Sequence, residues 1–220
     1  MVDVALYGNL TKDIIFNGFE QTTSIGSIGN VWDALVKLNQ KLSIHIEPTT
    51  IGTALIYVDT DNNTRVSKPN LYLKTNQPKI VEAKWSHILY LNHIKNLEFV
   101  KSIQNSVLSA DVAGKGKFDL DILTYIDYLF ISDEDIIDLD TLLDKVKGCV
   151  ILHSNSGSTI YKKDGTTIVT NHKTIDGVNV LGAGDYFASA FINCMLQTND
   201  IEISIKIAHN ETISFLKNKI

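Results

Sequence analysis

A glycine-rich turn followed by a carboxylate is the strongest chemical signal in the sequence. It reads Leu181-Gly182-Ala183-Gly184-Asp185-Tyr186-Phe187 and is followed by an apolar stretch, ASAFINCML. Glycines let a backbone approach a ligand closely, and the free N–H groups in the first turn of a helix bind anions. A carboxylate in such a place either caps the helix or acts as a base on a bound substrate. The spacing alone leaves both interpretations of Asp185 open.

The segment after this turn has the periodicity of a helix that packs on a core. Its apolar residues recur on one helical face, namely Phe187, Ala190, Phe191, Cys194 and Met195. A helix with one such face needs an apolar surface to cover. The turn and its carboxylate are therefore expected at the edge of a larger packed unit.

Upstream segments supply the elements that would position this turn. Residues 2–7 are apolar and predict a buried strand that ends in a loop at Gly8-Asn9. Residues 31–40 have helical spacing, and Asn30 before them is a natural N-cap. Residues 43–47 alternate as a strand does.

Further strands follow along the chain. Residues 54–60 and 64–73 flank the turn Asp61-Asn62-Asn63 and predict a hairpin. The other predicted strands are 86–91, 106–113, 126–132 and 149–154, and a short helix is predicted over 97–106.

The alternation of strands and helices predicts an α/β fold with a mainly parallel sheet covered on both faces. No internal repeat or flexible linker interrupts the 220 residues, so we expect a single domain over residues 1–220. The hairpin departs from the alternation and is too short to fold alone. It is expected to form a flap or lid, contributed mainly by residues 51–73.

Composition and charge exclude several classes of function. The net charge is −5, Arg65 is the only arginine, and the lysines are spread along the chain, so no nucleic-acid partner is expected. Cys149 and Cys194 lie in apolar stretches far apart and predict buried free thiols, which favours a reducing cytoplasm. The N-terminal segment lacks signal-peptide features and no apolar run could span a bilayer, so we expect neither export nor a membrane partner.

Several segments together resemble the pfkB family of ribokinase-like carbohydrate kinases. GVNVLGAGDYFASAFI at 177–192 is similar to the family signature around a DTxGAGD core. Other segments match in chain order: GNLTKDIIF, IGSIGNVWDAL, the hairpin as the β-lid, YIDYLFISDED, and ILHSNSGS as the nucleotide loop. The resemblance covers nearly the whole chain and implies a three-layer ribokinase-like sandwich.

The resemblance also implies an activity, namely ATP-dependent phosphorylation of a hydroxyl on a sugar or sugar-like small molecule. Asp185 would be the base, and the N–H groups around Gly182, Ala183 and Gly184 would face the transferring phosphoryl group. The residues that it implies for the acceptor are Thr11, Asp13, Gly26 and Asn30, those for the nucleotide are Ser154, Gly157 and His209, and Asp135 would serve Mg²⁺.

Departures from the family pattern raise a second hypothesis. Asn179 and Val180 replace the usual Asp-Thr, which puts a monovalent-cation site in doubt, and Leu152 and Ser154 replace a threonine and a glycine of the nucleotide loop. The chain could therefore be an active kinase or a catalytically weakened member that binds or regulates through a small molecule.

The hairpin suggests a partner as well. It would carry an apolar face formed by Ile51, Leu55, Tyr57, Val66, Leu71 and Leu73. Because such a face is usually covered, we expect a homodimer through the lid.

Overall fold

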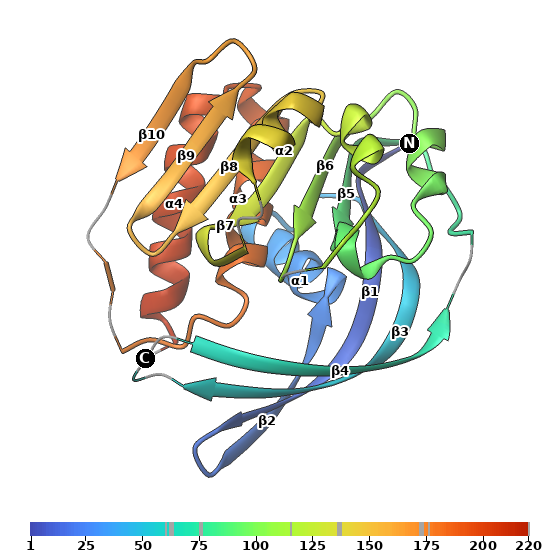
Figure 1. Cartoon of the computed structure of the whole chain (residues 1–220). Helices are drawn as coiled ribbons and strands as arrows, with labels where there is room; N and C mark the ends of the chain where they lie inside the picture. Colours follow the sequence, from blue (N-terminus) through green and yellow to red (C-terminus); the bar gives the residue numbers. More distant parts are fainter. Residues whose placement is uncertain are drawn as a thin grey trace.

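The computed structural model describes residues 1–59, 61, 64–74, 77–114, 116–135, 138–171, 174–175 and 177–219. Within these residues ten strands form one twisted sheet in the order β10-β9-β8-β7-β6-β5-β1-β3-β4, with β2 paired to β1 (Figure 1). The predicted α/β class with a mainly parallel sheet is confirmed. The predicted turn residues Asn62 and Asn63 lie outside the described residues.

The parallel part of the sheet consists of β8, β7, β6, β5, β1 and β3 in spatial order. These strands are β1 (Val2–Asn17), β3 (Ile44–Asp59), β5 (Ala83–Leu89), β6 (Val107–Val112), β7 (Tyr128–Ser132) and β8 (Cys149–Ser154). The strands β9 (Gly157–Lys162) and β10 (Thr167–Asn171) extend one edge antiparallel. Near the opposite edge of the sheet, β2 (Glu20–Ser27) pairs antiparallel with β1, and β4 (Thr64–Lys74) pairs antiparallel with β3.

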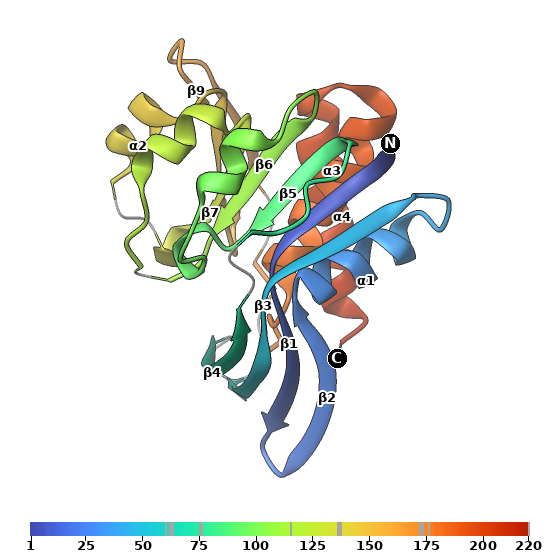
Figure 2. The same ribbon diagram turned by 90° about the vertical axis from the view of Figure 1, so that its right-hand side faces the viewer.

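Helices cover the two faces of the sheet unequally (Figure 2). One face carries α1 (Ile28–Leu38), α3 (Ala183–Thr198) and α4 (Ile201–Lys217). The other carries α2 (Leu139–Lys145) and the 3₁₀ helices η1 (Leu91–His93), η2 (Glu98–Ser102) and η3 (Leu120–Tyr125). A further 3₁₀ turn, η4 (Asp133–Asp135), follows β7. None of the described helices is both long and apolar enough to span a membrane.

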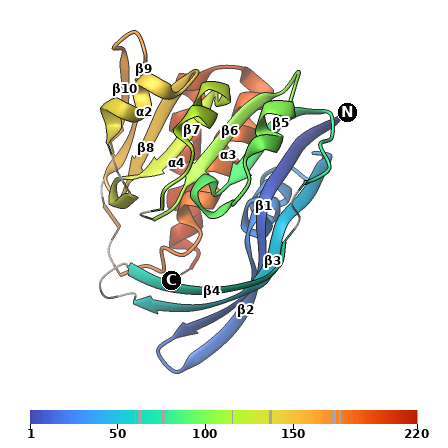
Figure 3. The same ribbon diagram turned by 45° about the vertical axis from the view of Figure 1, so that its right-hand side comes forward.

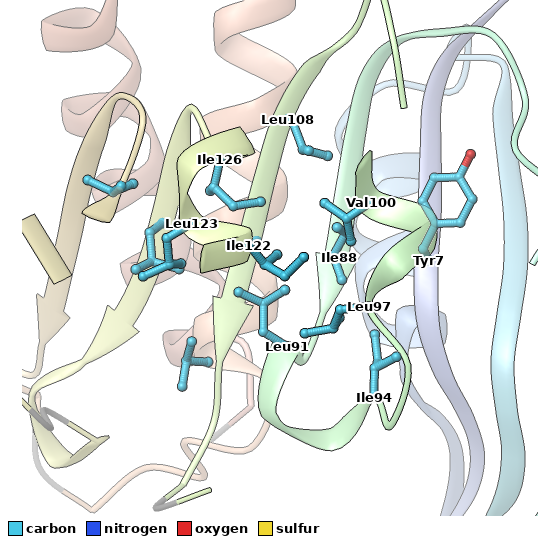
Figure 4. Close-up of a cluster of buried hydrophobic side chains, with 14 of the residues drawn as sticks. Tyr7, Ile88, Leu91, Ile94, Leu97, Val100, Leu108, Ile122, Leu123 and Ile126 are labelled. Carbon is cyan, nitrogen blue, oxygen red and sulfur yellow. The ribbon is translucent and has the colours of Figure 1, made fainter. Parts of the chain in front are cut away.

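Strand β1 is buried from both sides, which is why its first residues form a continuous apolar run. Val4 and Leu6 pack against the α1, α3 and α4 face, whereas Ala5 and Tyr7 pack against the face with the 3₁₀ helices. Figure 4 shows this second cluster, which also contains Ile88, Val100 and Leu108. The two cysteines are buried free thiols within this core framework, as predicted.

Two strands of the main sheet continue past its edge and form the lid (Figure 3). The lid consists of residues 10–17 of β1, 20–27 of β2, 50–59 of β3 and 64–74 of β4. At its base the β1–β3 register shifts between Gly8 and Asn9, because β3 carries an extra residue, Thr49, opposite this point. Gly8 has φ 152°, and a Cβ on it would lie 1.7 Å from the Leu89 carbonyl oxygen. Only glycine allows this close approach.

Several boundary predictions are corrected by these elements. The first strand does not end at Gly8-Asn9 but runs to Asn17, and the lid is not the 51–73 hairpin alone, because β2 and the far half of β1 contribute to it. Only one face of the lid is turned toward the site, and the other face is exposed to solvent. Its strands therefore lack the continuous apolar runs that identify strands buried on both faces. The helix predicted over 97–106 is the shorter 3₁₀ helix η2.

The predicted N-cap role of Asn30 is wrong. Helix α1 begins at Ile28 after Ser27, which has φ 55°, so Asn30 lies inside the first turn of the helix. Leu71, predicted for an outer apolar face of the lid, instead lines the cavity beneath the lid, because it pairs with Gly52 on the same face as Thr11. The side chain of Leu73 is outside the described ones.

Candidate active site

The glycine-rich turn places Asp185 in the first turn of α3. Gly182 precedes the helix in the left-handed conformation, with φ 76°, and the helix begins at Ala183. The Asp185 carboxylate is 6% exposed and accepts hydrogen bonds from Asn30 Nδ2 and from the Tyr90 hydroxyl, each at 2.8 Å. Its oxygens bond side chains from other elements rather than the helix's own N–H groups. The structure therefore does not support the helix-cap interpretation of Asp185.

Opposing effects act on the ionisation of Asp185. Burial raises its pKa, whereas the hydrogen bonds from Asn30 and Tyr90 and the positive charges of Arg65 and Lys219 lower it. A buried carboxyl group whose charge is stabilised by directed donors is suited to take up a proton.

A second buried carboxylate, Asp13, lies on the lid strand β1. It is 4% exposed and accepts a 2.6 Å hydrogen bond from Thr11 Oγ1. Burial raises its pKa, the Thr11 bond lowers it, and the charge of Asp185 raises it further. Gly26 on β2 faces this carboxylate, and a Cβ there would lie 2.1 Å from Asp13 Oδ2. Gly26 is therefore needed to leave room for Asp13.

Substituting Gly26 with alanine is expected to weaken acceptor binding, because the new methyl group must displace the Asp13 carboxylate. Overpacking of this kind typically costs about 1–3 kcal/mol, so the KM for the acceptor should rise by about fivefold or more. Steady-state kinetics with varied acceptor would measure it. Thr23→Ala, at an exposed position on the opposite face of β2, adds no atoms and serves as the control. An unchanged acceptor KM in the Gly26 variant would show that Asp13 is not an acceptor ligand.

The space between the lid and the sheet is a cavity of about 350 Å³, which suits a small molecule. The residues that line it include Asn9, Thr11, Asp13, Asn30, Tyr90, Gly182 and Asp185, with Ala54, Ile56, Pro69 and Leu71 on the lid side. The predicted acceptor residues Thr11, Asp13 and Asn30 thus meet Asp185 in one place, here called the acceptor cavity. Gly26 supports Asp13 without lining it.

Asn9 is an acceptor-cavity residue that sequence reasoning missed. The residue is only 4% exposed, and its buried Oδ1 accepts no hydrogen bond from any of the described residues. An unpaired buried amide oxygen is costly unless a ligand donates to it. The signal in the sequence was a polar residue directly after the apolar run of β1.

A second cavity lies on the other side of Asp185 and is here called the nucleotide-side cavity. It brings together the predicted residues Ser154, His209 and Asp135 with Ala183 and Gly184. Its apolar wall is formed by Ile175, Val178, Val180, Ile213 and Leu216. Such a wall beside a helix N-terminus is suited to a flat apolar ring attached to phosphates.

Gly157 does not line this cavity. Its φ is 155°, and a Cβ on it would lie 2.2 Å from the Thr170 carbonyl oxygen, so it serves the close pairing of β9 with β10. Ser154, by contrast, lines the cavity, but its hydroxyl also closes the local turn by donating to the Gly157 carbonyl oxygen at 3.2 Å and accepting from Ser156 N–H at 3.2 Å.

His153 is a further residue that the sequence did not single out. Its ring lies 5.4 Å from Phe187, and a Cβ on Gly184 would lie 3.3 Å from His153 Cε1. Burial lowers the pKa of His153 to about 4, and the nearby charges of Arg65 and His209 lower it in the same direction. A neutral imidazole therefore lies against the anion-binding turn.

The two cavities meet at a small space lined by Arg65, Tyr90, Asp111, Asp135, His153 and Asp185, among others. Asp111 is 5% exposed, and burial together with the charge of Asp185 raises its pKa well above its usual range. Asp111 was not predicted as a site residue, because it lies within the apolar strand β6. The only signal was a carboxylate among strand residues.

Arg65 lines all three spaces from the lid. Arg65 lies on β4 and pairs with Val58 on β3, and its charge lowers the pKa values of both Asp111 and Asp185. Because it belongs to an exposed hairpin in the sequence, its proximity to Asp185 could not be foreseen. The chain's only arginine thus stands where the acceptor and nucleotide-side cavities join.

Comparison with protein-family models gives a match over part of the chain. Residues 120–211 match the model of the pfkB family of carbohydrate kinases. A search of curated protein sequences found no match.

Solved structures match over almost the whole chain. The adenosine kinase from Sinorhizobium meliloti has 13% identity and a TM-score of 0.78, with 98% of this chain and 94% of that chain covered. The nucleoside kinase from Methanocaldococcus jannaschii has 18% identity and a TM-score of 0.70, with 99% and 92% covered. The ribokinase from Thermotoga maritima has 16% identity and a TM-score of 0.69, with 99% and 100% covered.

At these identities the likeness shows the fold, which is the ribokinase-like fold expected from the sequence. The family match lies over the segment that holds Asp135, Ser154, the glycine-rich turn and Asp185. Residues 120–211 thus match the pfkB family of carbohydrate kinases, and the ribokinase-like fold extends over nearly all of the chain.

Proposed function

We propose that the protein is an ATP-dependent phosphotransferase that phosphorylates a hydroxyl group of a sugar or sugar-like small molecule. The observation that carries the proposal is the position of Asp185. It is buried, bonded by two side-chain donors, and lies where a polar acceptor cavity meets a cavity suited to a nucleotide.

Asp185 is proposed to take the proton of the acceptor hydroxyl as that oxygen attacks the γ-phosphate. A carboxylate offers about four lone-pair sites, so the bonds from Asn30 and Tyr90 leave room for the hydroxyl to donate. Placement of such a base contributes about 10²- to 10⁴-fold to the rate. Asn30 was expected to contact the acceptor, and its bond to Asp185 adds a second role, that of orienting the base.

The acceptor is proposed to lie between the lid and the end of β1. Asp13, Thr11 and Asn9 offer oxygen acceptors to its hydroxyl groups, and this would satisfy the orphan oxygen of Asn9. The apolar lid residues cover it from above and exclude water, which favours transfer to the acceptor over hydrolysis.

The transferring phosphoryl group is proposed to lie against the N-terminus of α3. The N–H groups that follow Gly182 and the helix dipole favour negative charge there, and Arg65 adds a full positive charge from the lid. Phosphoryl transfer depends mainly on such positioning and charge stabilisation.

ATP and Mg²⁺ are the cofactors that this reaction needs, and the residues present fit them. Val178, Ile213 and Leu216 would hold the base of the nucleotide, with His209 and Ser154 beside it. Asp135 and Asp111 offer the carboxylate oxygens that Mg²⁺ prefers, and Mg²⁺ would supply neutralisation of phosphate charge. A monovalent-cation site remains doubtful, because Asn179 carries no charge and its Oδ1 accepts from the Leu181 N–H at 3.0 Å.

A second candidate function is that of a small-molecule binding or regulatory protein with weakened catalysis. It is favoured by the nucleotide loop, where Gly157 serves strand pairing and the Ser154 hydroxyl is bonded within its own turn. An acceptor panel of sugars, amino-sugar conjugates and nucleosides would separate the two functions. Acceptor-dependent ADP release supports the kinase, whereas calorimetric binding of an acceptor without ADP release supports the alternative.

We also propose that the protein acts as a cytoplasmic homodimer joined through the outer face of the lid. This face carries apolar side chains from neighbouring strands: Leu55 is 38% exposed, Tyr57 46% and Val66 58%. Phe16 stacks on Tyr57 with a ring separation of 5.1 Å, which extends the apolar surface. Exposed apolar faces of this kind usually meet a partner.

Replacing Tyr57 with glutamate is expected to convert the dimer to a monomer, because a charge would then face the apolar surface of the second copy. Light scattering of the parent and the variant would measure the mass in solution. Val169→Glu places the same charge on an exposed position of β10, away from the lid, and should leave the dimer intact. A monomeric parent protein would refute the proposal.

A further inference from the structure

The hydroxyl of Tyr90 contacts Asp185, the proposed base, directly. The resemblance to the kinase family gave no role to Tyr90. Tyr90 follows β5, and its hydroxyl donates to Asp185 Oδ1 at 2.8 Å, while Asn30 donates to Oδ2. Tyr90, which follows β5, thus holds one oxygen of the carboxylate, and Asn30, in α1, holds the other. A carboxylate held at both oxygens is fixed in orientation as well as in position.

The direction of this hydrogen bond is also fixed. Burial raises the pKa of Tyr90 well above its usual range, and the charges of Asp185 and Asp111 raise it further. Tyr90 therefore remains a phenol that can donate to Asp185. Its ring contacts the His93 ring edge-on at a centroid separation of 5.4 Å, which restrains it on the other side.

Several charged or titratable groups surround the Asp185 carboxylate from other elements. They are Asp13 on β1, Arg65 on β4, Asp111 on β6, Asp135 on η4, His153 on β8 and Lys219 after α4. These groups act through space, and both signs are present among them. Among the interactions described, only Tyr90 and Asn30 donate hydrogen bonds to the Asp185 carboxylate.

We propose, resting on the proposed function, that Tyr90 is a positioning residue whose hydroxyl keeps the Asp185 carboxylate ionised and aimed at the acceptor hydroxyl. A donor to a carboxylate stabilises its charged form, so loss of the donor favours protonation. A protonated Asp185 cannot accept the hydroxyl proton. Without the Tyr90 hydroxyl, activity should therefore be lost first at low pH.

The Tyr90→Phe variant tests this with little change in shape, because the ring and its contact with His93 are kept. The acid limb of the kcat/KM profile should move to higher pH. Below that limb kcat/KM should be about tenfold lower than in the parent, while on the plateau at higher pH it should lie within about threefold. Tyr128→Phe removes a hydroxyl from a partly buried tyrosine that stacks on Trp85, away from Asp185, and should leave the profile unchanged.

A direct measurement of Asp185 ionisation keeps the test independent of turnover. Carbon-13 NMR of the side-chain carboxyl groups, assigned by the signal that Asp185→Asn removes, gives the titration midpoint of Asp185 in the free protein. The midpoint should move to higher pH in Tyr90→Phe and stay in place in Tyr128→Phe.

A uniform loss of kcat/KM at all pH values, with an unchanged Asp185 midpoint, would overturn the inference and leave Tyr90 as a packing or acceptor-contact residue. In that case an active parent enzyme would still support the proposed function. If no acceptor is phosphorylated at all, the proposed function fails, and the NMR midpoint alone decides whether Tyr90 controls the ionisation of Asp185.

Discussion

The Asp185→Asn variant should lose at least about 10²-fold in kcat while keeping its fold and its affinity for ATP. An amide has nearly the shape of the carboxylate but cannot take up the hydroxyl proton. It also keeps one oxygen, so one of the two bonds from Asn30 and Tyr90 can persist. Steady-state kinetics with a competent acceptor, together with calorimetric titration of ATP, would measure both parts of the expectation.

Asp33→Asn is the matched control, because Asp33 lies exposed on α1 in an ion pair with Lys37 and away from the cavities. It should leave kcat near the parent value, since exposed ion pairs contribute little. An Asp185 variant that keeps its activity within about threefold of the parent would remove Asp185 from the role of base.

The Arg65→Gln variant should lower kcat by about 10²- to 10³-fold, with a smaller effect on acceptor affinity. Arg65 is proposed to face the charge that develops on the transferring phosphoryl group, and removal of one such donor typically has an effect of this size. Arg65→Lys should recover part of the loss, because lysine restores the charge but not the planar pair of donors. Measuring kcat and both KM values for the two variants would show this ordering.

Lys68→Gln is the control for Arg65. Lys68 lies on the same strand and pairs with Leu55 on the outer face of the lid, so its charge points away from the cavities. Equal effects of the Arg65 and Lys68 substitutions would show that the lid contributes only general positive charge, and the proposed contact of Arg65 would be wrong.

The parts of the site that sequence reasoning could predict are those encoded by local pattern. The turn at Gly182 and Gly184 combines glycine with a helical apolar face, and α3 begins within that turn as expected, with Phe187 and Phe191 buried. The strand over 149–154 was predicted with its observed bounds, because a buried parallel strand is a short apolar run.

The parts that were missed depend on long-range contacts. Asn30 looked like an N-cap because asparagine is common there, yet its amide donates to a residue 155 positions away. Tyr90 and Asp111 lie in segments whose pattern predicts core strands, and this pattern gives no role for their polar atoms. In the structure the ends of β5 and β6 lie near the start of α3, which brings both residues close to Asp185. Parallel topology brings strand ends together regardless of their separation in sequence.

The sequence predicted only the β3–β4 part of the lid, and the β1–β2 part was missed for a different reason. β2 is mostly exposed and polar, and its stability comes from pairing with β1 rather than from an apolar pattern. The same property hid Arg65, whose position on the inner face of the lid follows from the β3–β4 register. Neither feature can be derived from periodicity alone.

The most direct test of the account is to identify the product formed from ATP and a bound acceptor. Mass spectrometry of the reaction mixture should show the acceptor with the added mass of one phosphoryl group, formed by the parent protein and greatly reduced with Asp185→Asn. If acceptor and ATP both bind, as calorimetry would show, but no phosphate ester forms across the panel of acceptors, the proposed kinase activity is contradicted.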